Sequence, residues 1–263
     1  MQVSTAGRSN AQRLSRIAAL LAIGGLVSAL IAAVGSGSGA WPFGTGFIIL
    51  RYAFFAAVAG GVLAVGAMIL RWHRVTGFSW LDIVSLTAAL LFSVFLLGQI
   101  FTARSVPAIH DVATDIDNLP RFTTLQVRAD NLANIPNDGR PDLAALDPAN
   151  RWKALHRQAY GDLVPLRVPA SVDQTVGRAE ALARKRGWAI AKVDRAAGVV
   201  EATATSLFFR FKDDVVVRVR PDPLRRGGAV VDMRSISRVG GSDVGVNAER
   251  IRSFLADLRA QSR

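Results

Sequence analysis

The stretch I-A-A-L-L-A-I-G-G-L-V-S-A-L-I-A-A-V, residues 17–34, contains no charged side chain, and comparable stretches follow at 52–70 and 83–103. They contain 18, 19 and 21 residues. An α-helix rises about 1.5 Å per residue and needs about 20 apolar residues to cross roughly 30 Å of hydrocarbon. Core helices of soluble proteins, the alternative, seldom run this far without a charge. Residues 1–103 are therefore predicted to be a transmembrane domain of three helices, at about 14–34, 48–70 and 82–103.

The first apolar stretch could instead be a signal peptide, because Arg13 and Arg16 precede a run that ends in small residues. Its 18 residues are long for that purpose, so we expect an uncleaved anchor. Cleavage would leave two spans and would not change the side on which the C-terminal part lies.

The short loops predict the orientation in the membrane. Five arginines lie at the ends of the spans on the N-terminal side, and two lie on the other side. The five are Arg8, Arg13, Arg16, Arg71 and Arg74, and the two are Arg51 and Arg104. Cytoplasmic loops are enriched in basic residues, so the N-terminus is predicted to be cytoplasmic. Three spans then place the C-terminal part outside, which in a bacterium is the periplasmic or extracytoplasmic face of the inner membrane.

The second span has small residues at every fourth position, a spacing that lets a neighbouring helix approach closely. These residues are Ala53, Ala57 and Gly61, and beside them Ala56, Gly60 and Ala64. Packing inside this bundle is favoured over a dimer interface. The spans carry no mid-span ionisable group of the kind that transporters use, so they are interpreted as an anchor.

The chain contains no cysteine, which excludes disulfide bonds and thiolate metal sites. Its formal net charge is +12, and residues 102–263 carry 26 of the 32 basic and 19 of the 20 acidic side chains. A basic chain can indicate nucleic-acid binding, but an extracytoplasmic location argues against that partner. The expected partners are the lipid bilayer, an anionic lipid or envelope ligand and another membrane protein, and no cofactor is expected.

Residues 104–150 are predicted to be a connecting segment, because five prolines interrupt them and little periodicity remains. A short helix is expected at 148–160. The pair Ser171 and Gln174 forms a capping-box pattern that predicts a further helix, which ends at Gly187.

The rest of the C-terminal half alternates apolar and polar residues, which is typical of strands. Strands are predicted at 188–193, 199–211, 215–220 and 230–239. A final helix is expected to begin near Ser242 or Asp243. Residues 151–263 are therefore predicted to form an α+β extracytoplasmic domain, an antiparallel meander of about four strands with two helices on one face.

The strand register can also be predicted, because only one register keeps the apolar side chains on a single face. Pairing Val217 with Met233 achieves this. The same pairing places Arg218 opposite Asp232 on the polar face, with Arg220 nearby.

One polar cluster lies where the chain leaves the membrane, at His110, Asp111, Asp115 and Asp117. Three carboxylates and one imidazole could hold a divalent cation if they converge, and a metal-assisted hydrolase could then use them. The alternative is local turn capping by the aspartates, which is favoured because the spacing does not match a calcium loop.

A second polar cluster combines a strand end, a glycine turn and a helix start. Such a helix N-terminus favours anions, and neighbouring arginines could complete an anion site. The alternative is a structural network of ion pairs and caps, in which Asp243 already fills the cap. The candidate binding residues are Arg218, Asp232, Arg234, Ser235, Arg238, Ser242, Asp243, Asn247 and Arg250.

Catalytic motifs are missing from the sequence: there is no G-x-S-x-G, H-E-x-x-H, P-loop or dinucleotide-binding G-x-G-x-x-G. With three histidines in the chain, little is left for a histidine-based triad. No catalytic residue is predicted, and binding is favoured over enzymatic activity.

Three motifs carry a family resemblance: I-H-D-V-A-T-D at 109–115, F-K-D-D-V-V-V-R-V-R at 211–220 and V-D-M-R-S-I-S-R-V-G-G-S-D-V-G-V-N-A-E-R-I at 231–251. Together they resemble the domain of unknown function 1499 family over residues 106–260. The membrane half lies outside this match and looks like the anchor that some members carry. The resemblance implies no established activity. It implies that the two polar clusters recur in a shared architecture, in contact with each other.

The sequence thus predicts an uncharacterised multi-pass membrane protein with an extracytoplasmic domain. The expected function is a non-enzymatic binding or structural module of the cell envelope for an anionic ligand or partner. The alternatives are an assembly subunit of a membrane complex and, less favoured, the hydrolase at His110.

Overall fold

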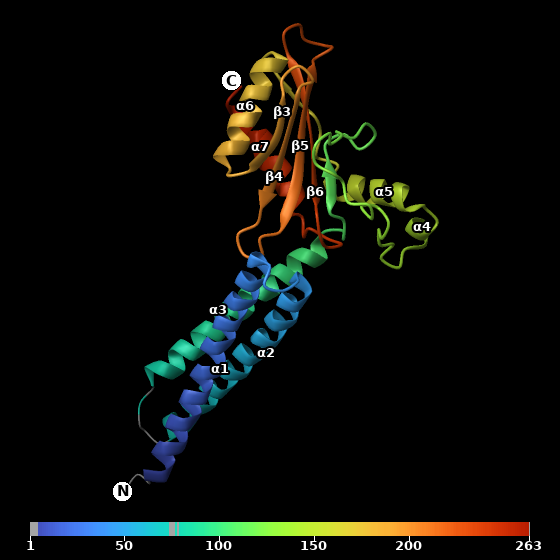
Figure 1. Cartoon of the computed structure of the whole chain (residues 1–263). Coiled ribbons are helices and arrows are strands. Elements are labelled where there is room, and N and C mark those ends of the chain that lie inside the picture. Colours follow the sequence, from blue (N-terminus) through green and yellow to red (C-terminus); the bar gives the residue numbers. More distant parts are fainter. Residues whose placement is uncertain (1–4, 74–76, 78, 263) are drawn as a thin grey trace. The chain divides into compact units, whose positions relative to one another are not determined.

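The computed structural model describes residues 5–73, 77 and 79–262, and it divides into two compact units (Figure 1). Arg74 and the side chain of Arg8, both used to predict the orientation, lie outside this description. The first unit comprises Met1–Phe101 together with Phe208–Arg210. The second comprises Thr102–Leu207 and Phe211–Arg263. Each unit is described separately.

The first unit is built from three long apolar helices, α1 (Thr5–Ser38), α2 (Phe43–His73) and α3 (Trp80–Ser105). Each has the length and composition to cross a membrane, as predicted. All three extend beyond the apolar runs at both ends. A tight turn with Gly39 at φ +81° joins α1 to α2.

Small residues let α1 and α2 pack closely. A Cβ atom added to Gly25 would lie 2.6 Å from the carbonyl oxygen of Ala53, and one added to Gly60 would lie 2.5 Å from the amide nitrogen of Ala22. The fourth-position spacing in α2 therefore serves packing within the chain, where Ala57 is also buried.

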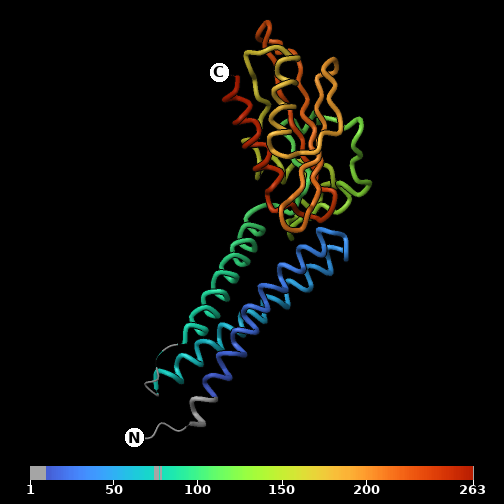
Figure 2. The backbone as a smooth tube through the Cα atoms, turned by 60° about the vertical axis from the view of Figure 1, so that its left-hand side comes forward, coloured from blue at the N-terminus to red at the C-terminus, as the bar shows by residue number. Residues whose placement is uncertain are grey.

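The helix α3 meets the other two near its own beginning and separates from them toward its end (Figure 2). Asp82, in its first turn, is fully buried. Its Oδ2 accepts a hydrogen bond of 3.1 Å from Nε of Arg71, and Arg71 also donates to Oγ of Ser15 over 3.1 Å. Arg71 thus links all three helices, through an ion pair with α3 and a hydrogen bond with α1.

The second unit contains an antiparallel sheet of six strands, in the order β1-β6-β5-β4-β3, with β2 also paired to β6. The strands are β1 (Asp111–Ala113), β2 (Leu166–Val168), β3 (Ala189–Asp194), β4 (Val199–Thr205), β5 (Lys212–Pro221) and β6 (Ala229–Ser237). The prediction of about four strands is wrong, because β1 and β2 have three residues each and are too short to show alternation. β1 also brings part of the expected connecting segment into the sheet.

The strand expected at 199–211 ends at Thr205. Arg210 has φ 55°, a left-handed conformation incompatible with a continuing strand. Hydrogen bonds of 2.8 Å from Ser206 N to Phe211 O and from Phe211 N to Ser206 Oγ close a loop instead.

The register of β5 and β6 is the predicted one, with Val217 opposite Met233 and Arg218 opposite Asp232. The apolar face is covered by α6 (Val172–Lys185) and by α7 (Val246–Ala260), as Figures 1 and 2 show. Both hydrogen bonds of the predicted Ser171 capping box are present.

Two further helices, α4 (Pro141–Ala144) and α5 (Pro148–Tyr160), lie beyond β1. The indole Nε1 of Trp152 donates to the Asp111 carbonyl over 2.9 Å, and the Ala113 amide donates to Nε2 of His156 over 3.2 Å. Side chains of α5 thereby form hydrogen bonds with backbone groups of β1 at the edge of the sheet.

Candidate functional site

The sheet face turned away from α6 and α7, here called the polar face, carries alternate residues of β4, β5 and β6. The charged or hydroxyl side chains on it are Glu201, Thr203, Thr205, Lys212, Asp214, Arg218, Arg220, Asp232 and Arg234. Residues 114–131 cross this face, because Asn118 contacts Arg218, Pro120 contacts Arg234 and Leu125 contacts Glu201. This part of the predicted connecting segment therefore covers the charged side chains of the sheet.

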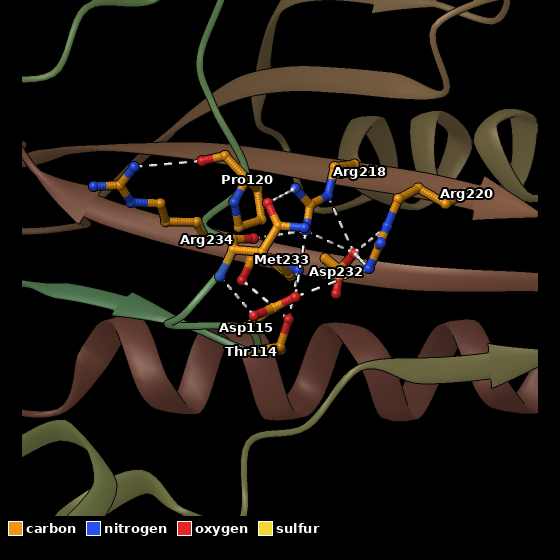
Figure 3. A network of polar contacts seen from close by, with 9 residues as sticks. Thr114, Asp115, Pro120, Arg218, Arg220, Asp232, Met233 and Arg234 are labelled. Atoms are coloured by element: carbon orange, nitrogen blue, oxygen red, sulfur yellow. Dashed lines mark hydrogen bonds and ion pairs between the residues drawn. The ribbon is translucent and has the colours of Figure 1, made fainter. Parts of the chain in front are cut away.

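Asp232 is the centre of one network on the polar face (Figure 3). Its fully buried Oδ2 accepts hydrogen bonds from Nε of Arg218 at 3.1 Å and from Nη2 of Arg220 at 2.8 Å. Asp115 adds a second carboxylate 3.6 Å from Nη2 of Arg218. Two arginines thus meet two aspartates, so the network has no surplus charge.

Arg234 and Asp111 form a second network beside the first. The guanidinium donates through Nε at 3.0 Å and through Nη2 at 2.7 Å to the two carboxylate oxygens. Asn131 also donates to Asp111 over 2.6 Å. Arg234 donates in addition to the Pro120 carbonyl over 3.3 Å (Figure 3). Both charged side chains are buried, so the pair joins β1 to β6 directly.

Arg238 follows β6 and pairs with Asp214 of β5. It donates through Nε and Nη2 over 2.8 Å each, and Thr203 accepts a further bond of 3.2 Å. The Arg238 side chain keeps 41% of its surface exposed. This arginine is held in place and still faces solvent.

The remaining candidate residues lie on the other face of the sheet, at the start of α7. Arg250 donates to Asp213 over 2.5 Å and to Ser235 over 2.9 Å, and it contacts Asn247. Ser242 accepts from the Val244 amide over 3.1 Å. The structure therefore divides the predicted binding residues between two faces.

Asp243 caps α7, although the helix begins at Val246, later than expected. Its carboxylate accepts hydrogen bonds from the amides of Gly245 at 2.9 Å and Asn247 at 2.8 Å. Burial raises the pKa of this carboxyl group. The helix N-terminus that could have attracted an anion is thus filled by a side chain of the protein itself.

The candidate metal ligands point to different partners. The Nδ1 atom of His110 lies 3.4 Å from the Gly241 carbonyl, while Asp117 pairs on the surface with Lys153 at 2.8 Å and Arg157 at 3.0 Å. Asp111 and Asp115 belong to the arginine networks. Among the residues that the structure describes, no three His, Asp or Glu side chains are placed to hold a metal ion. Asp115 also accepts a hydrogen bond of 2.9 Å from the Asn118 amide, which is turn capping of the kind expected as the alternative.

The two polar clusters of the sequence do meet in space, as the family resemblance implies. Asp111 pairs with Arg234, and the His110 carbonyl accepts a hydrogen bond of 3.0 Å from Nδ2 of Asn247. Both contacts fasten the segment that follows α3 to β6 and α7.

A cavity of about 380 Å³ opens beside the polar face, between the 114–131 segment and the ends of β5 and β6. It is lined by Phe122, Gln126, Val127, Arg128, Ala129, Asp214, Ile236, Ser237 and Arg238. Arg128 donates to Asp130 over 2.6 Å and to the Gly240 carbonyl over 2.7 Å, and this pairing lowers the pKa of Asp130 to about 2. The walls therefore combine two positioned guanidinium groups with aromatic and aliphatic surface.

Glu201 holds the segment that lines one side of the cavity, a role that the sequence did not predict. This fully buried carboxylate accepts hydrogen bonds from the amides of Thr123 at 2.6 Å, Thr124 at 3.0 Å and Leu125 at 2.8 Å. Burial opposes its ionisation, but these bonds together lower its pKa. The only signal in the sequence is an acidic residue at an alternate position of an apolar strand. Its partners come from an irregular segment that no pattern aligns with it.

A family model, described as a protein of unknown function (DUF1499), matches residues 111–258. The match contains every candidate binding residue and all of the sheet. A comparison with curated proteins finds no match to this chain.

Proposed function

The chain belongs to the DUF1499 family, and from this premise we propose that it is a membrane-anchored, non-enzymatic module that binds an anionic amphiphile in the cavity beside its polar face. The membrane anchor is the helical unit. The binding part is the cavity wall that carries Arg128 and Arg238. The proposed ligand is an envelope lipid, or a polymer with an anionic group and an apolar part.

The distribution of arginines supports this proposal. Arg218 and Arg234 are matched by carboxylates and keep only 16% and 10% of their side-chain surfaces exposed, so they stabilise the domain and offer a ligand little surface. Arg238 is different, because its guanidinium is positioned by Asp214 and yet 41% of the side chain is exposed at the cavity. A preorganised, partly exposed guanidinium is well suited to an anionic oxygen.

The apolar part of the cavity supports an amphiphile over a simple anion. Phe122, Val127 and Ile236 line the cavity together with the arginines. Ligand sites typically combine such apolar surface with a few polar groups that fix orientation. A volume of about 380 Å³ accommodates a headgroup or a short chain segment.

The predicted orientation of the anchor supports a location in the cell envelope. The excess of arginines on the N-terminal side predicts a cytoplasmic N-terminus, which places the domain and its cavity at the outer face of a bacterial inner membrane. Anionic headgroups are abundant at such a surface.

Ligand-dependent thermal unfolding of the full chain in detergent micelles tests the proposal. The probes are short-chain phosphatidylglycerol and phosphatidylcholine with identical acyl chains. We expect phosphatidylglycerol to raise Tm more than phosphatidylcholine does, and Arg238→Ala to abolish the difference.

Arg184→Ala is the matched control, because Arg184 pairs with Glu180 on α6 on the opposite side of the sheet. It should retain the full difference. Equal stabilisation by both lipids, or a difference that persists in Arg238→Ala, would contradict binding of the anionic group in this cavity.

An assembly subunit is the second candidate, and α3 favours it. All residues of 97–105 are exposed within the chain, and they include the polar Gln99. A glutamine amide in hydrocarbon gains from a partner helix. If this candidate is correct, Gln99→Leu should weaken co-purification of a membrane partner while leaving the thermal response to phosphatidylglycerol unchanged.

A further inference from the structure

The loop between β4 and β5, Ser206–Phe211, presents large apolar side chains to the outside. Leu207 is 80% exposed and Phe208 is 54% exposed. Adjacent exposed apolar residues of this size indicate an interaction surface.

This loop lies at the end of the sheet where the chain arrives from the membrane. The register places Asp213 opposite Ser237, and Asp111 pairs with the neighbouring Ile236. The start of β1 and the loop that precedes β5 are therefore at the same end. Backbone hydrogen bonds from Ser237 to His110, 3.0 Å, and from Asp243 to Ile109, 3.2 Å, hold the entering chain there.

The distance from this end to the membrane is limited by covalent geometry. The helix α3 ends at Ser105, and residues 106–110 connect it to β1. Five extended residues reach at most about 18 Å. This end of the sheet is therefore tethered within about 18 Å of the end of α3.

The charges around the loop match a lipid surface. Arg210 and Lys212 are exposed and follow the apolar tip in the chain. Val246, also exposed, begins α7 at the same end of the sheet. Apolar side chains with basic neighbours are the combination found in segments that lie in membrane interfaces.

We propose that the β4–β5 loop is an interfacial membrane anchor that inserts Leu207 and Phe208 among the lipid headgroups of the membrane that its own helices span. Arg210 and Lys212 then contact anionic lipids. The loop fixes the domain to the bilayer as a second attachment point, in addition to α3. This inference is independent of the ligand proposed for the cavity.

The opposite end of the sheet supplies a matched control. Leu224, in the loop between β5 and β6, is 81% exposed and is followed by Arg225. It resembles Leu207 in residue type, exposure and neighbouring charge, but it lies at the other end of β5. An exposed leucine with an arginine nearby is thus present in both loops, and the two loops lie at opposite ends of the sheet.

Site-directed spin labelling tests the proposal, and the chain contains no cysteine that would interfere. Leu207→Cys and Leu224→Cys are labelled with a nitroxide in the full chain, reconstituted into vesicles of phosphatidylethanolamine and phosphatidylglycerol. The measurement compares collision with oxygen, which concentrates in lipid, and with a water-soluble nickel chelate. We expect the oxygen-to-nickel accessibility ratio to be several times higher at position 207 than at position 224.

Two outcomes would overturn the proposal. Equal, water-like ratios at both positions would show that the loop does not enter the lipid. Protection of position 207 from both reagents would show that protein, such as a second copy, covers the loop. Phe208→Cys repeats the test at the adjacent side chain in case the Leu207 variant does not fold.

Discussion

Arg234 and Asp111 form a buried ion pair across 123 residues of sequence, and the polar face depends on it. Removal of one partner from such a pair leaves an uncompensated buried charge, which typically costs about 3–5 kcal/mol. We therefore expect Arg234→Ala to lower the free energy of unfolding by that amount, measured by denaturant unfolding of the full chain in detergent.

Two controls separate the buried charge from other effects of the Arg234 substitution. Arg184→Ala removes an exposed ion pair and should cost less than about 1 kcal/mol. The double variant Arg234→Met with Asp111→Asn removes both charges and should recover part of the loss. A cost for Arg234→Ala no larger than that for Arg184→Ala would show that the pair contributes little.

His156 gives the domain a dependence on pH. Burial lowers its pKa from 6.5 to about 4, and its Nε2 accepts a hydrogen bond from the Ala113 amide. The unfolded chain then binds more protons than the folded chain between these values. The stabilising contribution of neutral His156 is complete above pH 6.5 and is lost as the pH falls toward 4. Through this group the free energy of unfolding decreases by about 2 kcal/mol between pH 7 and pH 5.

The measurement for His156 is thermal unfolding at pH 7 and pH 5, in the original chain and in His156→Gln. Glutamine can accept the Ala113 hydrogen bond but does not titrate, so the variant should lose less stability on acidification. Asp243 acts with the opposite sign, because a raised carboxyl pKa favours the folded state at low pH. It is present in both chains and cancels in the comparison. An identical pH dependence of the two would refute the role of His156.

The ion pairs of the polar face could be predicted from the sequence to different extents. Arg218 and Asp232 lie in long alternating strands, so the register could be deduced, and with it their pairing. The partner of Arg234 lies in a strand of three residues, and that of Glu201 in an irregular segment. Neither partner has a periodic pattern that could align it with the sheet.

At the scale of elements, close contact between α1 and α2 makes a testable distinction between two adjacent glycines. A Cβ atom at Gly25 would lie 2.6 Å from the Ala53 carbonyl oxygen, whereas nothing lies within 4 Å of one at Gly24. We expect Gly25→Val to separate the helices and lower Tm in detergent, because small residues drive this packing. Gly24→Val, with the same change in composition, should leave Tm within experimental error. Similar shifts for both would mean that helix propensity, not packing, determines the effect.

The elements with local signals could be predicted well, and those without them could not. Ser171 and Gln174 marked the start of α6, and both capping bonds are present. At α7 the cap comes from Asp243, but the helix begins only after the left-handed Gly245, so the start was expected too early. The cavity could not be predicted, because its walls come from an irregular segment and from strand ends that only the folded chain brings together.

At the scale of the whole molecule, the distribution of charge predicts which side of the membrane each part occupies. Five arginines on the N-terminal side against two on the other predict a cytoplasmic N-terminus, and an odd number of spans then places the domain outside. Leu224→Cys reports on the side of the membrane that the domain occupies. His73→Cys lies at the exposed end of α2 and reports on the side predicted to be cytoplasmic. In intact spheroplasts, a membrane-impermeant maleimide should label position 224 directly and position 73 only after permeabilisation. The reverse pattern would place the domain in the cytoplasm and remove the envelope ligand from the proposed function, while the interfacial loop would then face the inner leaflet, where anionic lipid is also present.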